Sequence, residues 1–196
     1  MIDEMAISEG LNIDLSTNFI VSSPTLPSST GYFAEFATHA LVFMLGGLNT
    51  RWKQAIGYHF TGPSICSKSF KDVVLKIVEE CEKIGLTINA VVSDMGPQNQ
   101  ALWKECGVYA KRNKIKKKDE ESGQIENIFE FNYKNYCLHS SDPDRKLYFF
   151  ADPPHVFKNI RNLFLSGENI SLPETVVVEE NFPTPNVSIE HVKSVI

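Results

Sequence analysis

Two aspartates occupy positions where their carboxylates can meet. Asp3 lies in the alternating segment "IDEMAIS", which predicts a strand at the beginning of the chain. Asp94 ends the apolar segment "TINAVVSD", which predicts a buried strand that runs into a Gly-Pro turn. Carboxylates at strand ends of an α/β sheet point into the crevice where ligands bind. If the two strands are neighbours, the pair can hold Mg²⁺ or Mn²⁺, which would activate a water or a 3′-hydroxyl to attack a phosphodiester.

Other interpretations of these residues stay open. An aspartate before Gly-Pro is often a turn former, and Asp3 can simply be an exposed residue near the chain end. Glu4 competes with Asp3, because adjacent side chains of a strand point to opposite faces and only one of them can face the crevice. Gln98 and Asn99 follow Asp94 on a predicted helix, where we interpret them as capping residues.

A second candidate site lies in "ADPPHVFKNIRN", residues 151–162, directly after the apolar segment "KLYFF". Asp152 can cap a helix that begins at Pro153 and Pro154, since the missing N–H groups of prolines cost nothing in a first turn. A helix N-terminus attracts anions, and Lys158 can reach a phosphate bound there. The alternative is a strand-to-helix junction with a polar stripe that faces solvent. The chain has no Walker-type glycine-rich loop, which argues against a conventional P-loop site.

The order of predicted elements indicates a mixed sheet. Antiparallel strands come first, and alternating helices and strands follow from Ser67 onward, which favours an α/β fold with helices packed on the sheet. Residues 111–127 are predicted to be a polar, charged loop. This loop opens with "KRNKIKKK", which holds six basic residues in eight and is either solvated, a phosphate-contacting arm or a nuclear localisation signal. The sequence after Gly167 gives no firm prediction.

Composition limits the classes of protein. The 196 residues suit one domain or slightly more, and the formal net charge of −5 argues against a dedicated DNA-binding module, although not against an enzyme that meets DNA through a local patch. The four cysteines form no C-x-x-C pair, which favours a reducing compartment over a disulfide framework. We find neither a secretory signal nor an apolar run long enough for a membrane span, and we expect no membrane partner.

Four stretches together resemble the P-element-type transposases, a family that includes THAP-domain transposase-derived proteins. They are "IDEMAI", "LGGLNTRWKQAIGYHFTG", "VVSDMGPQNQALWKECG" and "FFADPPHVFKNIRN", in the family's order. The resemblance implies an RNase H-like catalytic domain with Asp3 and Asp94 as the first two catalytic aspartates. It also implies that Asp152 and Lys158 belong to a guanine-nucleotide site, at the junction to a GTP-binding insertion. DNA, as transposon ends and target, a homo-oligomer and a nuclear location are implied as well.

The sequence departs from the family pattern in two respects. It has no cysteine-rich zinc finger at its beginning, and it stops near the point where the insertion would begin. We therefore expect a fragment, with residues 1–165 as a partial RNase H-like domain and residues 166–196 as a tail or the beginning of the insertion. Acidic residues of the tail do not match the family's final catalytic glutamate; they are Glu168, Glu179, Glu180 and Glu190. The alternative is a non-catalytic, transposase-derived nuclear module that binds DNA or protein.

Overall fold

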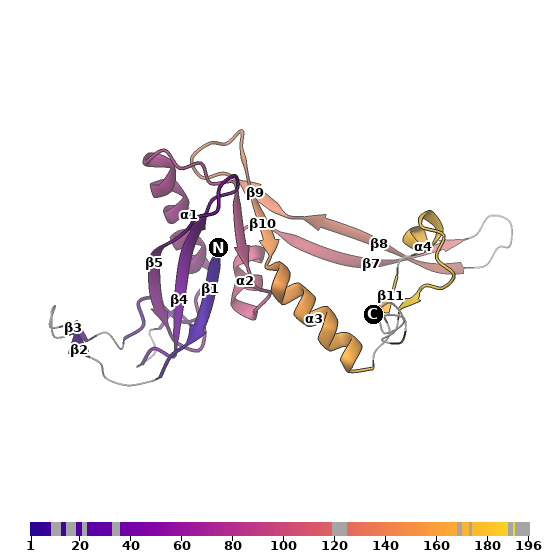
Figure 1. Ribbon diagram of the computed structural model, residues 1–196, viewed down its shortest axis with the longest axis horizontal. Coiled ribbons are helices and arrows are strands. Elements are labelled where there is room, and N and C mark those ends of the chain that lie inside the picture. Colours follow the sequence, from indigo (N-terminus) through magenta and orange to yellow (C-terminus); the bar gives the residue numbers. More distant parts are fainter. Residues whose placement is uncertain are drawn as a thin grey trace. The chain divides into compact units, whose positions relative to one another are not determined.

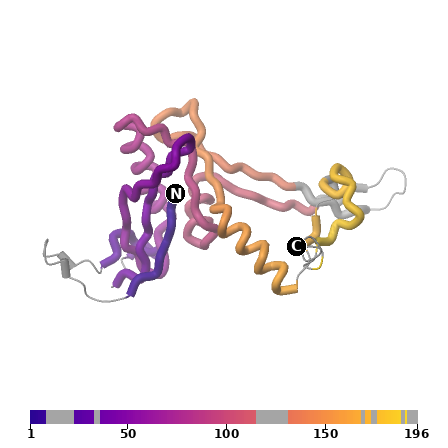
Figure 2. The backbone as a smooth tube through the Cα atoms, viewed as in Figure 1, coloured from indigo at the N-terminus to yellow at the C-terminus, as the bar shows by residue number. Residues whose placement is uncertain are grey.

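The chain is divided into two compact units. The first comprises Met1–Ala110 and Tyr133–Ala151, and the second comprises Lys111–Asn132 and Asp152–Ile196. Figure 2 follows the backbone through both units. The computed structural model describes residues 1–8, 13–14, 19–20, 23–32, 36–118, 125–167, 170–172, 174–187 and 190. The division that the sequence predicts at residue 165 stays a prediction.

The first unit is built on two three-stranded sheets (Figure 1). One has the order β1-β4-β5 and is antiparallel, whereas the other has the order β6-β10-β9, with β6 and β10 parallel. Strands β1 and β6 lie next to each other, so the sheets meet there. The main elements of the first unit are β1 (Ile2–Ala6), β4 (His39–Gly46), β5 (Lys53–Thr61), α1 (Ser67–Lys83), β6 (Ala90–Ser93), α2 (Pro97–Glu105), β9 (Tyr136–Leu138) and β10 (Lys146–Ala151). The predicted mixed α/β architecture is confirmed.

Helices α1 and α2 pack against each other and share one core with both sheets. Apolar side chains four residues apart put one stripe of α1 into this core, as the helical spacing predicts. Helix α1 ends before Gly85, whose φ of +86° is the left-handed conformation that favours glycine after a helix. The most buried core side chains are Leu41 (β4), Phe70 (α1), Leu102 (α2) and Leu147 (β10).

The other face of the sheets carries exposed residues. Strand β10 alternates buried Leu147 and Phe149 with exposed Tyr148 and Phe150, because successive strand residues point to opposite faces. Strand β1 does the same at its beginning, with Ile2 buried and Asp3 exposed. This alternation decides which carboxylate of β1 meets the helices.

The predicted loop at residues 111–127 is wrong for the part that the structure describes. Strand β7 (Tyr109–Lys118) pairs with β8 (Ile125–Lys134), so the basic run is part of a two-stranded sheet. Lysine is disfavoured in strands, and pairing with an aromatic-rich neighbour outweighs that preference. Composition alone does not reveal such a neighbour.

The remaining elements are short, apart from one helix. They are β2 (Ile13–Asp14) and β3 (Phe19–Ile20), which pair with each other, α3 (Pro153–Leu165), β11 (Ile170–Ser171), α4 (Glu174–Glu179) and β12 (Asn186–Val187). The segment "TNFIVSS", residues 17–23, reads as a strand in the sequence, and the structure describes its residues Phe19, Ile20 and Ser23. Across the described part of the chain, no helix has both the length and the apolar character to cross a membrane.

Candidate functional site

The turn after β6 fixes the carboxylate of Asp94. The backbone N–H of Gly96 donates to Oδ1 of Asp94 at 2.8 Å, and the side-chain amide of Asn99 donates to the same oxygen at 2.6 Å. A Cβ atom at position 96 would lie 3.0 Å from this oxygen, so glycine leaves room for the carboxylate. Helix α2 begins immediately afterwards, at Pro97. The half-buried Asp94 is therefore oriented by the strand, the turn and the helix together.

Glu4 lies in the electrostatic field of Asp94. It pairs with Leu41 of β4 and points to the face that the helices cover. Burial raises the pKa of Glu4 and the Asp94 carboxylate raises it further, whereas His39 lowers it. The side chains of Gln98 and Thr61 approach the Glu4 carboxylate and also lower its pKa. Two carboxylates thus share one partly buried environment between β1 and the beginning of α2.

Several oxygen atoms around this pair have no hydrogen-bond partner within the described residues. They are Oε1 of Glu4, Oε1 of Gln98 and Oδ1 of Asn99. Thr61 is fully buried, and Asn99 is 4% exposed. A buried polar atom without a partner lowers the free energy of unfolding by about 1–3 kcal/mol. A hydrogen-bond donor or a cation bound to these oxygens would offset that cost. Carboxylate, amide and hydroxyl oxygens are the hard ligands that Mg²⁺ and Mn²⁺ accept, so the residues fit a divalent ion.

Asp3 has different surroundings. Its side chain is exposed and accepts a hydrogen bond from the backbone N–H of Glu4 at 3.0 Å. It lines a shallow hollow with apolar neighbours on the face away from the helices, among them Met5 and Val42. Strands β1 and β6 are neighbours, as a metal site shared by Asp3 and Asp94 requires. That shared site stays a prediction.

The capping interpretation of Gln98 and Asn99 covers only part of their surroundings, because Asn99 binds Asp94 and Gln98 approaches Glu4. Sequence reasoning missed Thr61 and His39 entirely. These two residues are partners across the β4–β5 ladder. Antiparallel register depends on residues far apart in the sequence, and no local pattern marks either one.

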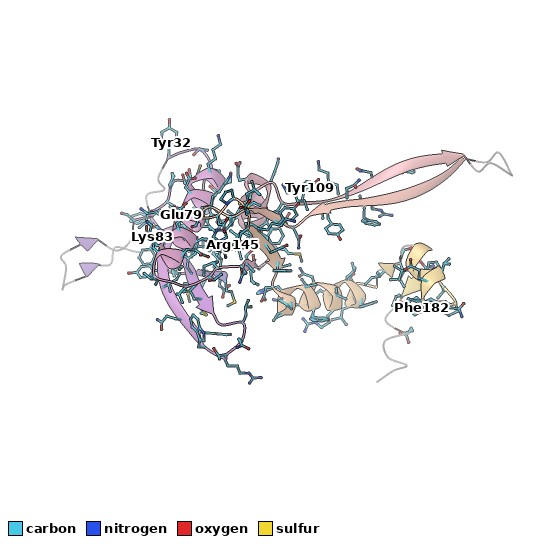
Figure 3. The ribbon with its side chains drawn as sticks, turned by 90° about the horizontal axis from the view of Figure 1, so that it is seen from above. Tyr32, Glu79, Lys83, Tyr109, Arg145 and Phe182 are labelled. Atoms are coloured by element: carbon cyan, nitrogen blue, oxygen red, sulfur yellow. The ribbon has the colours of Figure 1, made fainter. Side chains whose placement is uncertain are left out.

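A partly buried ion-pair network anchors the segment that leads into β6. Glu82, near the end of α1, accepts hydrogen bonds from the backbone N–H of Ile88 at 2.7 Å and from the guanidinium of Arg145 at 3.0 and 3.1 Å. The ring of His139 lies 3.3 Å from Glu82 and 3.0 Å from the carbonyl oxygen of Ile88. Figure 3 shows Arg145 beside helix α1. The network thus fixes the segment before β6 to helix α1.

The second candidate site forms the predicted strand-to-helix junction. Asp152 caps α3 and accepts a hydrogen bond from the backbone N–H of His155 at 3.4 Å, while Nδ1 of His155 lies 2.7 Å from Oδ2 of Asp152. Both prolines stand in the first turn, as predicted. Lys158 is exposed one turn further along. Asp152 therefore has a capping role, and a guanine-nucleotide role for Asp152 and Lys158 stays a prediction.

Known proteins resemble the chain in sequence and in fold. The P transposase of Drosophila melanogaster, named for the transposable element P, is 24% identical over 165 residues, which cover 84% of this chain and 17% of that protein. The Drosophila P element transposase in a strand transfer complex has the same fold, with a TM-score of 0.60 and 21% identity over 98% of this chain and 32% of that one. The chain thus spans less than a third of the length of either relative.

A family match covers the strands and helices that carry Asp94 and Glu4. Residues 1–107 match the family described as TNP-like, RNase H N-terminal domain. The predicted RNase H-like fold and the predicted resemblance to P-element-type transposases are confirmed. The chain belongs to the family of TNP-like RNase H N-terminal domains and is a transposase-related, RNase H-like domain.

Proposed function

We propose that the chain supplies part of a transposase active site that cleaves a phosphodiester of DNA and transfers the freed strand. The observation that carries this proposal is the fixed carboxylate of Asp94, held at the end of β6, the strand that lies next to β1. The relatives named as P element transposases, one of them in a strand transfer complex, support DNA as the partner.

The residues of this chain would hold the metal and orient it. Asp94 would be one ligand, already oriented by Gly96 and Asn99, and a carboxylate of β1 would be the other. The predicted residue of that strand is Asp3, whose exposed side chain is accessible to a large substrate. When bound, Mg²⁺ or Mn²⁺ supplies an activated water or 3′-hydroxyl and stabilises the leaving oxygen.

The test is metal-dependent nicking of a DNA duplex by the chain. We expect Asp94→Asn to abolish Mn²⁺-dependent nicking, because the amide removes the charge that binds the ion. Asp144→Asn is the matched control, since Asp144 is an exposed aspartate of the same unit. Nicking that survives in Asp94→Asn would contradict the proposal.

A second candidate function is non-catalytic binding of DNA or protein. One observation favours it: no group of three or more histidine, cysteine or acidic side chains that could hold a metal ion occurs in the described part of the chain. Retained DNA binding without any Mn²⁺-dependent nicking would support this function. The nuclear location, the homo-oligomer and the GTP dependence stay predictions under both proposals.

A further inference from the structure

We propose that the open edge of strand β5 and the groove beside it bind an extended peptide segment of another protein, with apolar side chains at every second position. Strand β5 is the outermost strand of the sheet β1-β4-β5, and only β4 pairs with it in the described part of the chain (Figure 1). Strand β1, which lies next to β6, is at the opposite edge of that sheet. The peptide site is therefore separate from the proposed metal site and goes beyond the proposed function.

A groove of about 760 Å³ runs between β5 and helix α1. Its walls are mainly apolar and come from β5, from α1 and from the residues that precede β5 and follow α1; they include Trp52, Ile56, Val73, Ile77, Ile84 and Leu86. Three of these side chains stay accessible to water, with exposures of 41% for Trp52, 40% for Ile56 and 75% for Ile84. A concave apolar surface of this kind is typical of a binding site, because a ligand that covers it removes apolar area from water.

A glycine leaves the groove open on the β5 side. In the antiparallel ladder Gly57 lies opposite Phe43, whose side chain is only 3% exposed, so position 57 is on the helix-covered face of the sheet. A Cβ atom at Gly57 would meet no atom within 4 Å. The side chains of a ligand therefore have room to enter beside the strand.

The backbone of β5 directs hydrogen-bonding groups toward the same edge. The N–H of Thr25 donates to the carbonyl oxygen of Phe60 at 2.7 Å, and the N–H of Phe60 donates to the hydroxyl of Thr25 at 3.0 Å. Both main-chain groups of Phe60 thus point away from β4. Alternate residues of a strand direct these groups to the same side, so those of Tyr58 point outward as well. Another extended backbone is the ligand that pairs with such an edge.

The chain already shows this mode of binding at one end of the edge. Thr25 pairs with Phe60, and the next residue, Leu26, is 6% exposed and belongs to the core shared by the sheet and α1. A peptide alongside the rest of β5 would repeat the arrangement, with its backbone on the edge and every second side chain in the groove. Lys76 and Glu80 also line the groove, and their opposite charges suit a peptide without net charge.

The test measures binding of synthetic hexapeptides to the whole chain by fluorescence anisotropy. The probes carry Val, Ile, Leu or Phe at every second position and Ser or Thr between them, and the control peptides have the same composition with the apolar residues adjacent. We expect the alternating peptides to bind more tightly than the controls. N-methylation of a single peptide amide that faces β5 should weaken binding by about two- to tenfold, as the loss of one hydrogen bond does.

Two variants of β5 separate the groove from the stability of the fold. Gly57→Val should weaken peptide binding by about tenfold or more, because its side chain takes up the open space. Its urea midpoint should stay equal to that of the wild type or rise, since valine favours a strand more than glycine does. Tyr58→Thr is the matched control: it changes an exposed side chain on the other face of the same strand and should bind peptide as the wild type does.

Three results would overturn the inference: no binding of the alternating peptides, equal binding of alternating and control peptides, or unchanged binding in Gly57→Val. Sedimentation velocity gives a fourth. A wild-type dimer that Gly57→Val dissociates would make a second copy of this chain the ligand of the edge in place of another protein. Each of these results leaves the metal-dependent nicking of the proposed function untouched, so the two can fail independently.

Discussion

Glu82 is the residue whose loss should most weaken the attachment of the segment before β6 to helix α1. Its carboxylate joins α1 to the backbone of Ile88 and to the side chain of Arg145. We expect Glu82→Ala to destabilise the first unit, since it removes every bond of this carboxylate at once. The helix itself should tolerate the change because alanine has the highest helix propensity.

The expected magnitude follows from the bonds that break. The N–H of the half-buried Ile88 loses a 2.7 Å hydrogen bond to a charged acceptor, which costs about 1–3 kcal/mol. The Arg145 pair adds little to this, because the Arg145 side chain is 29% exposed and water can replace its partner. We therefore expect a loss of about 2 kcal/mol, which for a urea dependence of about 2 kcal/mol per M lowers the unfolding midpoint by about 1 M.

The assay is urea unfolding followed by circular dichroism, with Glu80→Ala as the matched control. Glu80 lies on the same helix two residues earlier, and its bond to Lys83 at 2.8 Å joins two exposed side chains. Exposed pairs of this kind contribute little to stability, so the control should leave the midpoint unchanged. Equal midpoints for the two variants would refute the reasoning that the Glu82 network holds the segment before β6.

Three further predictions concern titration and binding. Hydrogen bonds from Arg145 lower the pKa of Glu82. The contribution of Glu82 to the free energy of unfolding should therefore be complete above about pH 4.3 and be lost as the pH falls through the lowered pKa. If the stability of wild type and Glu82→Gln changes in the same way during acid titration, this prediction is wrong. A hydrogen bond from the Cys106 thiol lowers the pKa of Cys137 to about 7. Iodoacetamide should therefore label the chain in a fast phase whose rate rises with pH and has its midpoint near pH 7. If this fast phase persists in Cys137→Ser, Cys137 is not the reactive cysteine. Lys158→Ala should weaken GTP binding if the predicted nucleotide site exists, and equal affinity for variant and wild type would remove Lys158 from it.

Local patterns predicted the elements whose sequence carries its own signal. The segment "KQAIGYHFT" alternates as a strand would, and it forms β5 (Lys53–Thr61). The proline pair marks the beginning of α3 correctly. Strand β7 was missed because a lysine-rich segment becomes a strand only through pairing with β8. Such pairing is not visible in a local window.

The candidate site was predicted only in part, for a related reason. Asp94 stands out because an apolar strand and a Gly-Pro turn flank it. The choice between Asp3 and Glu4 depends on which face of β1 the helices cover, and the contributions of Thr61 and His39 depend on how β4 and β5 align. Both are properties of residues far apart in the sequence.

The pairing of β1 with β4 places Asp3 opposite Val42 and Glu4 opposite Leu41. A slip of this pairing by one residue would turn every side chain of β1 over, exchange the two carboxylates and expose Ile2 to water. Which of the two acids of β1 faces the helices is thus encoded in strand alignment rather than in the type of residue alone. A one-residue insertion or deletion in β1 would consequently act as a double substitution at the site, although it changes neither acid.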